Sequence, residues 1–155
     1  PQLSKMGYMP DCARLDLAVR RSYHALDTSP FGLAAFQAMA PDAMMNQRLP
    51  LAPSTIILRS DWPLYDIWRF NMIDDAPKPR VMAQDVLITR PEFDPVPHLL
   101  PHGSANWLDA LAKGHTLETA SDAAQASHPD LDLAVAMTTA FSSGAFCDNS
   151  GAQDA

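Results

Sequence analysis

Two histidines, His98 and His102, have the spacing that binds a metal ion on a helix, where residues i and i+4 share one face. Three of their neighbours, Pro97, Pro101 and Gly103, exclude a regular helix at this point of the chain. No third ligand lies nearby in the sequence, so the pattern predicts neither a metal site nor a cofactor. The other histidines are dispersed and suit solvent-exposed or capping roles: His24, His115 and His128.

Nucleophilic and acid–base catalysis also lack the residue patterns that they require. A nucleophile needs a serine or cysteine beside a base, but the chain has no G-x-S-x-G motif and no signature around Cys12 or Cys147. The pairs Asp74-Asp75 and Asp130/Asp132 fall in a turn and at a helix start, where acids are expected for structural reasons. No glycine-rich phosphate loop exists. The sequence therefore predicts that the chain is not an enzyme, and an enzyme would need a deep pocket with convergent polar groups.

Composition points to one domain with its own core. The chain has 155 residues, of which 47% are hydrophobic. We expect this domain to span residues 1–147 and residues 148–155 to form a disordered tail. The two cysteines lie near opposite ends of the chain, and we expect them to be free thiols in a cytoplasmic protein. No run of 18 apolar residues exists, so we expect no contact with a membrane.

The charge of the chain is negative and unevenly distributed. The formal net charge is −7, and the segment from Gly114 to Ala155 contains six acids but no lysine or arginine. A surface of this sign repels a polyanion. Binding of DNA through the last third of the chain is therefore disfavoured.

The segment from Ser54 to Asn71 predicts the nucleus of the core. Ser54–Leu58 is rich in β-branched and apolar residues and predicts a strand. Ser60 and Asp61 can cap a following helix, and Pro63 suits its first turn. One face of that helix is apolar, with Leu64, Ile67, Trp68 and Met72 at helical spacing.

Other segments predict an α+β fold with a small, mostly antiparallel sheet. Helices are expected over Pro10–Leu26 and Gly32–Ala40, the first with an apolar stripe that runs from Cys12 through Leu15, Val19 and Tyr23 to Leu26. Further strands are expected at Asp85–Thr89 and at Val96–Leu100, the latter an edge strand with Pro97 on its unpaired side. A sheet of this size leaves an edge open.

The last third of the chain predicts a compact unit of three helices. Their expected caps and bounds are Ser104 before Ala105–Lys113 with Gly114 after it, Thr116 before Leu117–Ala126, and Asp130 before Leu131–Ser143 with Gly144 after it. Trp107, Leu108 and Leu111 are expected to line the first helix, and Leu131, Val135, Thr138 and Phe141 the last.

This sheet with three helices resembles the winged helix–turn–helix arrangement, which has two competing uses. A DNA reader inserts a basic or amide-bearing helix into the major groove, but Leu131–Ser143 carries no base. A peptide reader lets an extended segment add a strand to the open sheet edge. The sequence favours peptide capture, and a third interpretation, a helical scaffold that only packs against the sheet, stays open.

Several runs of residues resemble the HvfC/BufC family of peptide-modification chaperones. The similarity extends from about Met9 to Phe146 and corresponds to the family's C-terminal domain. The most specific run is R-S-D-W-P-L-Y-D-I-W-R-F-N at Arg59–Asn71. The others are A-R-L-D at Ala13–Asp16, S-Y-H-A-L-D at Ser22–Asp27, V-L-I-T-R-P at Val86–Pro91 and W-L-D-A-L-A-K-G-H-T-L at Trp107–Leu117.

The resemblance implies a non-catalytic partner of a TIM-barrel, multinuclear-iron oxygenase that modifies cysteines of a ribosomally made precursor peptide. The partner would bind the precursor's leader and present its core, and the iron ligands would belong to the enzyme, so no metal or catalytic residue carries over. In the family this domain follows an N-terminal helical domain, which is expected to be missing here. From the sequence pattern, one open strand, either Val86–Thr89 or Val96–Leu100, is expected to pair with the leader, and an exposed apolar patch that includes Phe93, Leu99 or Leu100 is expected to contact the enzyme. The candidate binding residues are therefore Val86, Leu87, Ile88, Thr89, Phe93, Leu99 and Leu100.

The alternative function is that of a DNA-binding transcriptional regulator, the label that the family's N-terminal domain carries. Its support in this chain is a small set of basic residues: Arg14, Arg20, Arg21, Lys78 and Arg80. They are few for a DNA interface, and Asp16 lies one helical turn from Arg20.

Overall fold

The computed structural model describes residues 6–148 and has the α+β architecture expected from the sequence. Three antiparallel strands form one sheet, and seven helices surround it within the described residues. The elements in chain order are α1 (Met9–Tyr23), α2 (Leu33–Gln37), α3 (Pro41–Asn46), β1 (Ile56–Leu58), α4 (Leu64–Met72), β2 (Val86–Thr89), β3 (Val96–Leu99), α5 (Ser104–Ala112), α6 (Leu117–Ser127) and α7 (Leu133–Ser142).

The centre of the sheet is β2, which pairs with β1 on one side and β3 on the other. Its register places Ile88 opposite Ile56 and Pro97, and Leu87 opposite Ile57 and His98. All four residues of β2 are buried, so the strand faces apolar layers on both sides. Its continuous V-L-I-T run is the sequence pattern that two-sided burial requires.

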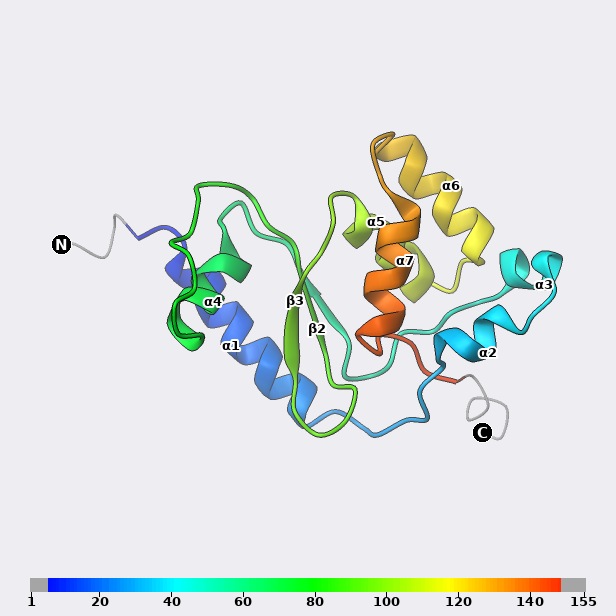
Figure 1. Cartoon of the computed structure of the whole chain (residues 1–155), viewed down its shortest axis with the longest axis horizontal. Helices are drawn as coiled ribbons and strands as arrows, with labels where there is room; N and C mark the ends of the chain where they lie inside the picture. Colours follow the sequence, from blue (N-terminus) through cyan, green and yellow to red (C-terminus); the bar gives the residue numbers. More distant parts are fainter. Residues whose placement is uncertain (1–5, 149–155) are drawn as a thin grey trace.

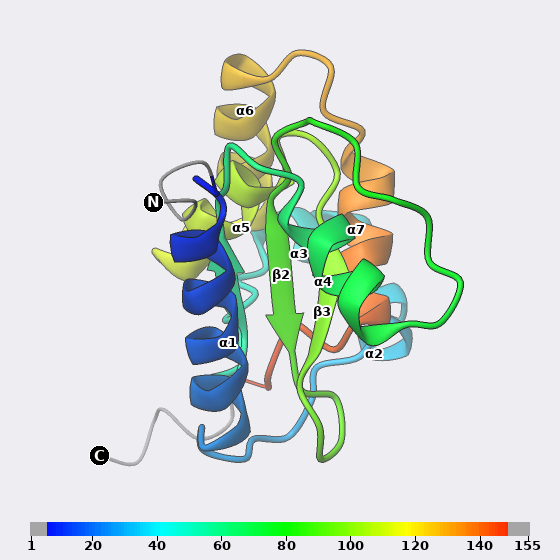
Figure 2. The same cartoon turned by 90° about the vertical axis from the view of Figure 1, so that its left-hand side faces the viewer.

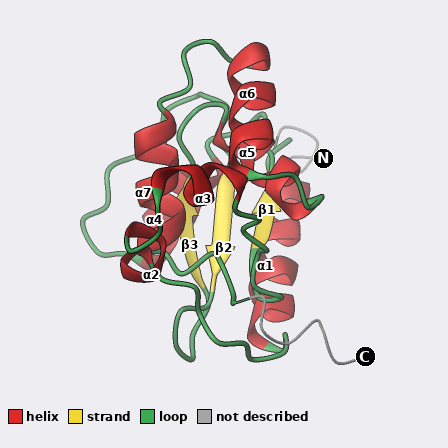
Figure 3. Cartoon of the chain, turned by 90° about the vertical axis from the view of Figure 1, so that its right-hand side faces the viewer, coloured by secondary structure: helices red, strands yellow, loops and turns green. Residues whose placement is uncertain are grey.

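Helices cover both faces of the sheet (Figure 1). On one face α1 and α4 lie over the strands (Figure 2), with Leu15, Leu64 and Ile88 in a shared cluster of buried residues. On the opposite face lie α5, α6 and α7, with α2 and α3 at their side (Figure 3). The larger core cluster on that side includes Leu87 and Trp107.

Several local signals in the sequence fix the helix ends as predicted. The Thr116 hydroxyl caps α6 by accepting a hydrogen bond from the Thr119 N–H at 3.3 Å. Gly114 and Gly144 adopt φ values of 83° and 74° directly after α5 and α7, a left-handed conformation that favours glycine. The predicted burial of Trp107 in α5 is also confirmed.

Neither Ser60 nor Asp61 caps α4, whose N-cap position is held by Pro63 without a side-chain cap hydrogen bond. Two further predicted caps are wrong by one or two residues. Gly103, with φ 78°, holds the N-cap position of α5, so Ser104 lies inside the helix and is buried. Asp132 rather than Asp130 caps α7, where its Oδ1 accepts from the Val135 N–H at 3.1 Å. Both segments contain alternative cap residues, and tertiary packing decides which one is used.

Two predicted apolar stripes are partly wrong. In α7 the residues turned inward are Ala136, Ala140 and Phe141, whereas Val135 is 46% exposed. The buried face of α7 therefore includes small alanines, which periodicity over the larger apolar residues does not reveal. The first helix ends at Tyr23, three residues before the predicted end, and Leu26 is 79% exposed.

The segment that follows α7 is hydrogen-bonded to two segments from the first half of the chain. The Ala52 N–H donates to the Ala145 carbonyl at 2.9 Å, and the Phe31 N–H donates to the Phe146 carbonyl at 3.1 Å. Phe146 is itself 1% exposed and packs edge-to-face against Trp107. Residues 6–148 thus share one hydrogen-bonded body, and the predicted disordered tail lies, apart from Asp148, outside the described residues.

Leu87→Ala should destabilise the fold far more than Val96→Ala, because the central strand is buried on both faces and the edge strand is not. The first change leaves a cavity beside the main core and should cost about 2–5 kcal/mol of unfolding free energy. The second removes part of a side chain that is 38% exposed, and should cost below about 1 kcal/mol. Urea unfolding followed by circular dichroism measures both values, and similar losses would contradict the central position of β2.

Candidate functional site

Strand β3 lies at one edge of the sheet, and within the described residues its outer side pairs with no other strand. The Leu100 N–H donates to the Asp85 carbonyl at 2.9 Å, which extends the β2–β3 ladder beyond the strands. Hydrogen-bonded pairs alternate along an antiparallel ladder, so the backbone groups of residues 97 and 99 point away from β2. These outward groups are what an added strand would contact.

Prolines remove most of the donors from this edge. Continuing the alternation, the outward positions are 95, 97, 99 and 101, and three of them are proline. Leu99 therefore supplies the one outward N–H in this stretch, while the carbonyls of Pro97 and Leu99 supply acceptors. Proline on an edge strand limits pairing with other chains. This edge can pair with a short, defined segment but is a poor template for aggregation.

The expectation that Val86–Thr89 forms an open strand is wrong. It occupies the centre of the sheet, where both neighbours use its backbone groups, and Val86, Leu87, Ile88 and Thr89 are each 0% exposed. The sequence shows that the strand is buried but does not reveal strand order. A proline at Ile88 would therefore break the sheet rather than report on peptide binding.

The remaining predicted contact residues divide between surface and core. Phe93 is 80% exposed in the β2–β3 connection, and Leu99 is 43% exposed on the edge strand. Leu100 is 5% exposed and belongs to the main core, so its predicted role in an exposed patch is wrong. The structure brings Leu99 to an accessible edge and keeps Phe93 on the loop that precedes β3.

A cavity of about 760 Å³ with a mixed polar and apolar lining lies beside the end of β3 and is lined in part by Leu99, His102, Arg59 and Asp85. Its walls come from α1, the segments on either side of α4, and the β3–α5 turn. The sequence does not reveal this cavity, because up to 90 positions lie between the residues that line it and only the folded sheet brings them together.

The charged groups of this cavity are largely paired with one another. Asp11 accepts from Arg14 Nη1 at 2.9 Å and from the Ser60 hydroxyl at 2.6 Å. Arg59 Nη2 lies 2.7 Å from Asp109 Oδ2. Because both arginines already contact carboxylates, the cavity has little net attraction for a phosphate, and it suits a neutral or mixed polar segment.

Among the acids that line the cavity, Asp85 has an environment that disfavours the ionised carboxylate. Burial raises the pKa of the Asp85 carboxyl, and this cause outweighs Arg59 and the Ser60 backbone N–H, which lower it. The lining includes one hydroxyl, that of Ser60, which donates to Asp11 at 2.6 Å and accepts from the Trp62 N–H at 3.1 Å. A raised acid beside a hydroxyl that is engaged in this way is compatible with a binding pocket and does not define a reaction.

The histidines do not form the pair suggested by their spacing. His98 lies on β3 with its Nε2 3.0 Å from Thr89 Oγ1, and burial lowers the pKa of its imidazole. His102 instead lies near His128 and Asp130, with candidate ligand atoms within 4.8 Å of one another. The sequence does not reveal that these three residues meet, because 25 positions, which include helices α5 and α6, lie between the two histidines.

Both cysteines are free thiols in the structure, as predicted. Burial raises the pKa of the Cys12 and Cys147 thiols, which reduces their reactivity at neutral pH. Among the described residues, no helix has the combined length and apolar character needed to cross a bilayer.

Comparisons of the chain with protein-family models, curated proteins and solved structures find no match. The resemblance to the HvfC/BufC peptide-modification chaperones therefore rests on the sequence motifs alone.

Asp85→Asn should stabilise the protein relative to the wild type by an amount that grows with pH. Because the native pKa is raised, the wild type loses stability as pH rises from the ordinary aspartate value, about 4, through the native value. The asparagine variant has no such loss. Urea unfolding of both proteins at several pH values from about 3 to 7 measures the difference, and a difference that shrinks as pH rises would contradict the burial of this carboxyl.

Proposed function

We propose that this chain is a non-catalytic binding protein that recognises a ribosomally made, cysteine-containing precursor peptide and presents it to a partner multinuclear-iron oxygenase. The observation that supports it most directly is the unpaired β3 edge beside a cavity of mixed polar and apolar lining. The class of peptide and enzyme proposed here is the one that the resemblance to the peptide-modification chaperones implies. The peptide, the enzyme and a cytoplasmic location are parts of this proposal.

Recognition would begin with backbone pairing along β3. The Leu99 N–H and the carbonyls of Pro97 and Leu99 would pair with one leader strand, which would become the fourth strand of the sheet. Alternate side chains of the leader would then face the two sides of the sheet. Because Leu99 also lines the cavity, a side chain at the matching leader position would lie over the cavity and help to select the peptide.

The enzyme would contact apolar side chains that the fold leaves exposed. Phe93, 80% exposed, stays a candidate beside the β3 edge. A second group, which the sequence pattern did not indicate, lies in the last turn of α4 and in the connection after it: Phe70, Met72, Ile73, Val81 and Met82, each at least 45% exposed. Large exposed apolar residues of this kind are typical of surfaces that bind another protein.

Leu99→Pro should abolish leader binding while Leu99→Ala retains it, because only the proline removes the outward N–H. Loss of that hydrogen bond and the added ring should weaken binding at least about tenfold. The alanine variant keeps the N–H and should stay within about threefold of the wild type. Fluorescence anisotropy with the leader half of the precursor encoded nearest to this chain's gene measures both affinities.

Thermal unfolding provides the control for this pair of variants. Residue 99 lies on the unpaired side of β3, so both proteins should keep the wild-type circular dichroism spectrum. A folded Leu99→Pro protein that binds the leader as tightly as the wild type would refute capture at this edge. If both variants bind the leader equally weakly, recognition depends on the Leu99 side chain and not on its backbone N–H.

A DNA-binding regulator is the second candidate function. The observations against it are the described surface beyond Gly114, which has acids but no lysine or arginine, and helix α7, which has no basic residue. Arg14, one of its few supporting residues, contacts Asp11 at 2.9 Å. A gel shift at low salt should detect no binding, and a retarded band that weakens steeply as salt rises would favour this function instead.

A further inference from the structure

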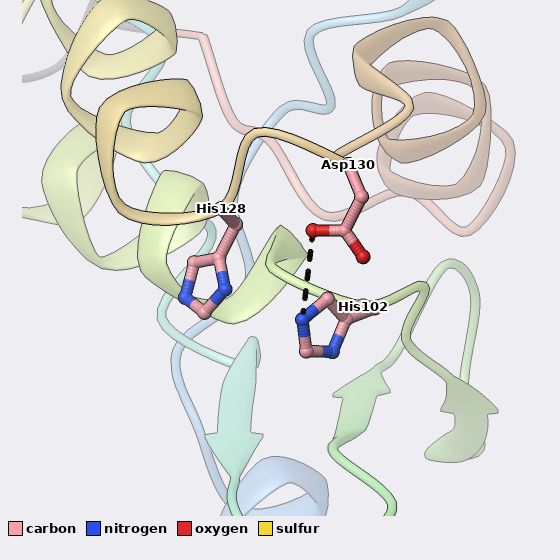
Figure 4. A group of neighbouring side chains, drawn as sticks. All are labelled: His102, His128 and Asp130. Atoms are coloured by element: carbon pink, nitrogen blue, oxygen red, sulfur yellow. Dashed lines mark ion pairs between the residues drawn. The ribbon is translucent and has the colours of Figure 1, made fainter.

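Two connections of the C-terminal unit bring three potential metal ligands together (Figure 4). His102 lies in the turn between β3 and α5, whereas His128 and Asp130 lie between α6 and α7. His102 Nε2 is 3.8 Å from Asp130 Oδ1, and the two imidazole rings meet edge-to-face with their centroids 4.9 Å apart. One candidate ligand atom from each residue lies within 4.8 Å of the other two.

Backbone geometry fixes the approach of the two histidines. Gly103 has φ 78°, and a Cβ at this position would lie 2.9 Å from the Cβ of His128. Any other residue would therefore meet both a conformational and a steric penalty. The glycine lets the turn that carries His102 pack directly against the base of His128.

A chain of polar contacts orients the His128 ring. Asp109 binds Arg59 Nη2 at 2.7 Å, and the same nitrogen donates to Asn106 Oδ1 at 2.7 Å. The oxygen of the Asn106 amide must therefore face Arg59, which leaves its Nδ2 group 2.8 Å from His128 Nε2. Because His128 Nε2 is engaged there, the ring nitrogen available to the cluster is Nδ1. Figure 4 shows one ring nitrogen of His128 turned toward His102 and Asp130.

We propose that His102, His128 and Asp130 form a binding site for a divalent transition-metal ion of the Zn²⁺ class, with one coordination position left open. Two imidazoles and one carboxylate without a thiolate suit Zn²⁺, Co²⁺ or Ni²⁺ better than Mg²⁺ or Ca²⁺. This inference does not rest on the proposed peptide function, although His102 also lines the cavity beside β3.

The distances allow a tetrahedral site after small side-chain rotations. Ligand atoms about 2.0–2.2 Å from Zn²⁺ lie roughly 3.3–3.5 Å from one another, compared with 3.8 Å between His102 Nε2 and Asp130 Oδ1. The side chains of His102 and Asp130 are 69% and 72% exposed, so few contacts oppose their rotation. His128, the more buried of the three, is held by Asn106 and acts as the fixed ligand.

Metal binding requires a change of tautomer at His128. Without the ion, Nε2 accepts from the Asn106 amide, so the neutral ring carries its proton on Nδ1. Coordination through Nδ1 places that proton on Nε2, and the ring stays neutral. The Nε2–H group then needs an acceptor, which Asn106 supplies if its amide turns over and gives up its contact with Arg59. Arg59 keeps its partner Asp109.

Titration of the intact chain with Zn²⁺ tests the site directly. We expect one ion per chain by isothermal titration calorimetry and a tetrahedral Co²⁺ absorption spectrum when Co²⁺ replaces Zn²⁺. His102→Ala and Asp130→Asn alter exposed side chains and should leave the fold unchanged. His102→Ala should weaken binding at least about 100-fold, since even residues that merely orient a ligand contribute about 10–100-fold. His115→Ala, which removes an exposed histidine elsewhere, should leave the affinity unchanged.

Asn106→Asp tests the proposed role of His128 Nδ1. A carboxylate at position 106 accepts from both Arg59 and the Nε2–H group, as in carboxylate–histidine–metal arrangements, and should tighten Zn²⁺ binding about tenfold. A purely electrostatic effect of the added carboxylate would also raise the affinity for Mg²⁺. We expect Mg²⁺ binding by this variant to stay undetectable. Equal Zn²⁺ affinity in wild type and folded His102→Ala, or weaker binding in Asn106→Asp, would overturn the proposal.

Discussion

Burial of β2 on both faces is the constraint on which the rest of the structure depends. A strand of four buried residues needs an apolar layer above and below it and a paired strand on each side. The α1/α4 layer covers one face, and the helices built around Trp107 cover the other. Because both neighbours of β2 are short, the sheet ends after three strands, and the edge beyond β3 is a consequence of the same arrangement.

The chemistry of that edge follows from the prolines of the middle segment. They keep β3 extended and remove the N–H groups that would otherwise recruit another chain along its whole length. A backbone with one outward donor and several acceptors can still bind, but it binds over a short stretch and in a defined register. The same residues that limit aggregation at the edge would therefore make the proposed pairing selective, and the Leu99 N–H is the outward donor on which a paired strand would depend.

The sequence predicted those features that short-range physics controls. The V-L-I-T run, the Thr116 cap and the glycines at 114 and 144 act within a few residues, and the structure confirms each of them. The predictions from the sequence were wrong where the structure depends on residues that lie far apart in the chain. Strand order placed Val86–Thr89 in the centre instead of at an edge, and the packing of Ala136 and Ala140 turned Val135 outward. Neither result can be read from periodicity, because periodicity identifies a buried face but not its neighbour.

The candidate sites lie together because the β3–α5 turn belongs to both the sheet and the helical unit. Leu99 belongs to the edge strand, His102 follows it within one turn, and α5 is then anchored by the fully buried Trp107. Polar residues on a loop are usually mobile, but this loop spans two rigid elements and is closed by a glycine in a conformation that few residues adopt. The backbone of this turn is consequently held in position, which is the condition that precise binding of a peptide or an ion requires, and the exposed side chain of His102 can rotate toward a ligand from this fixed base.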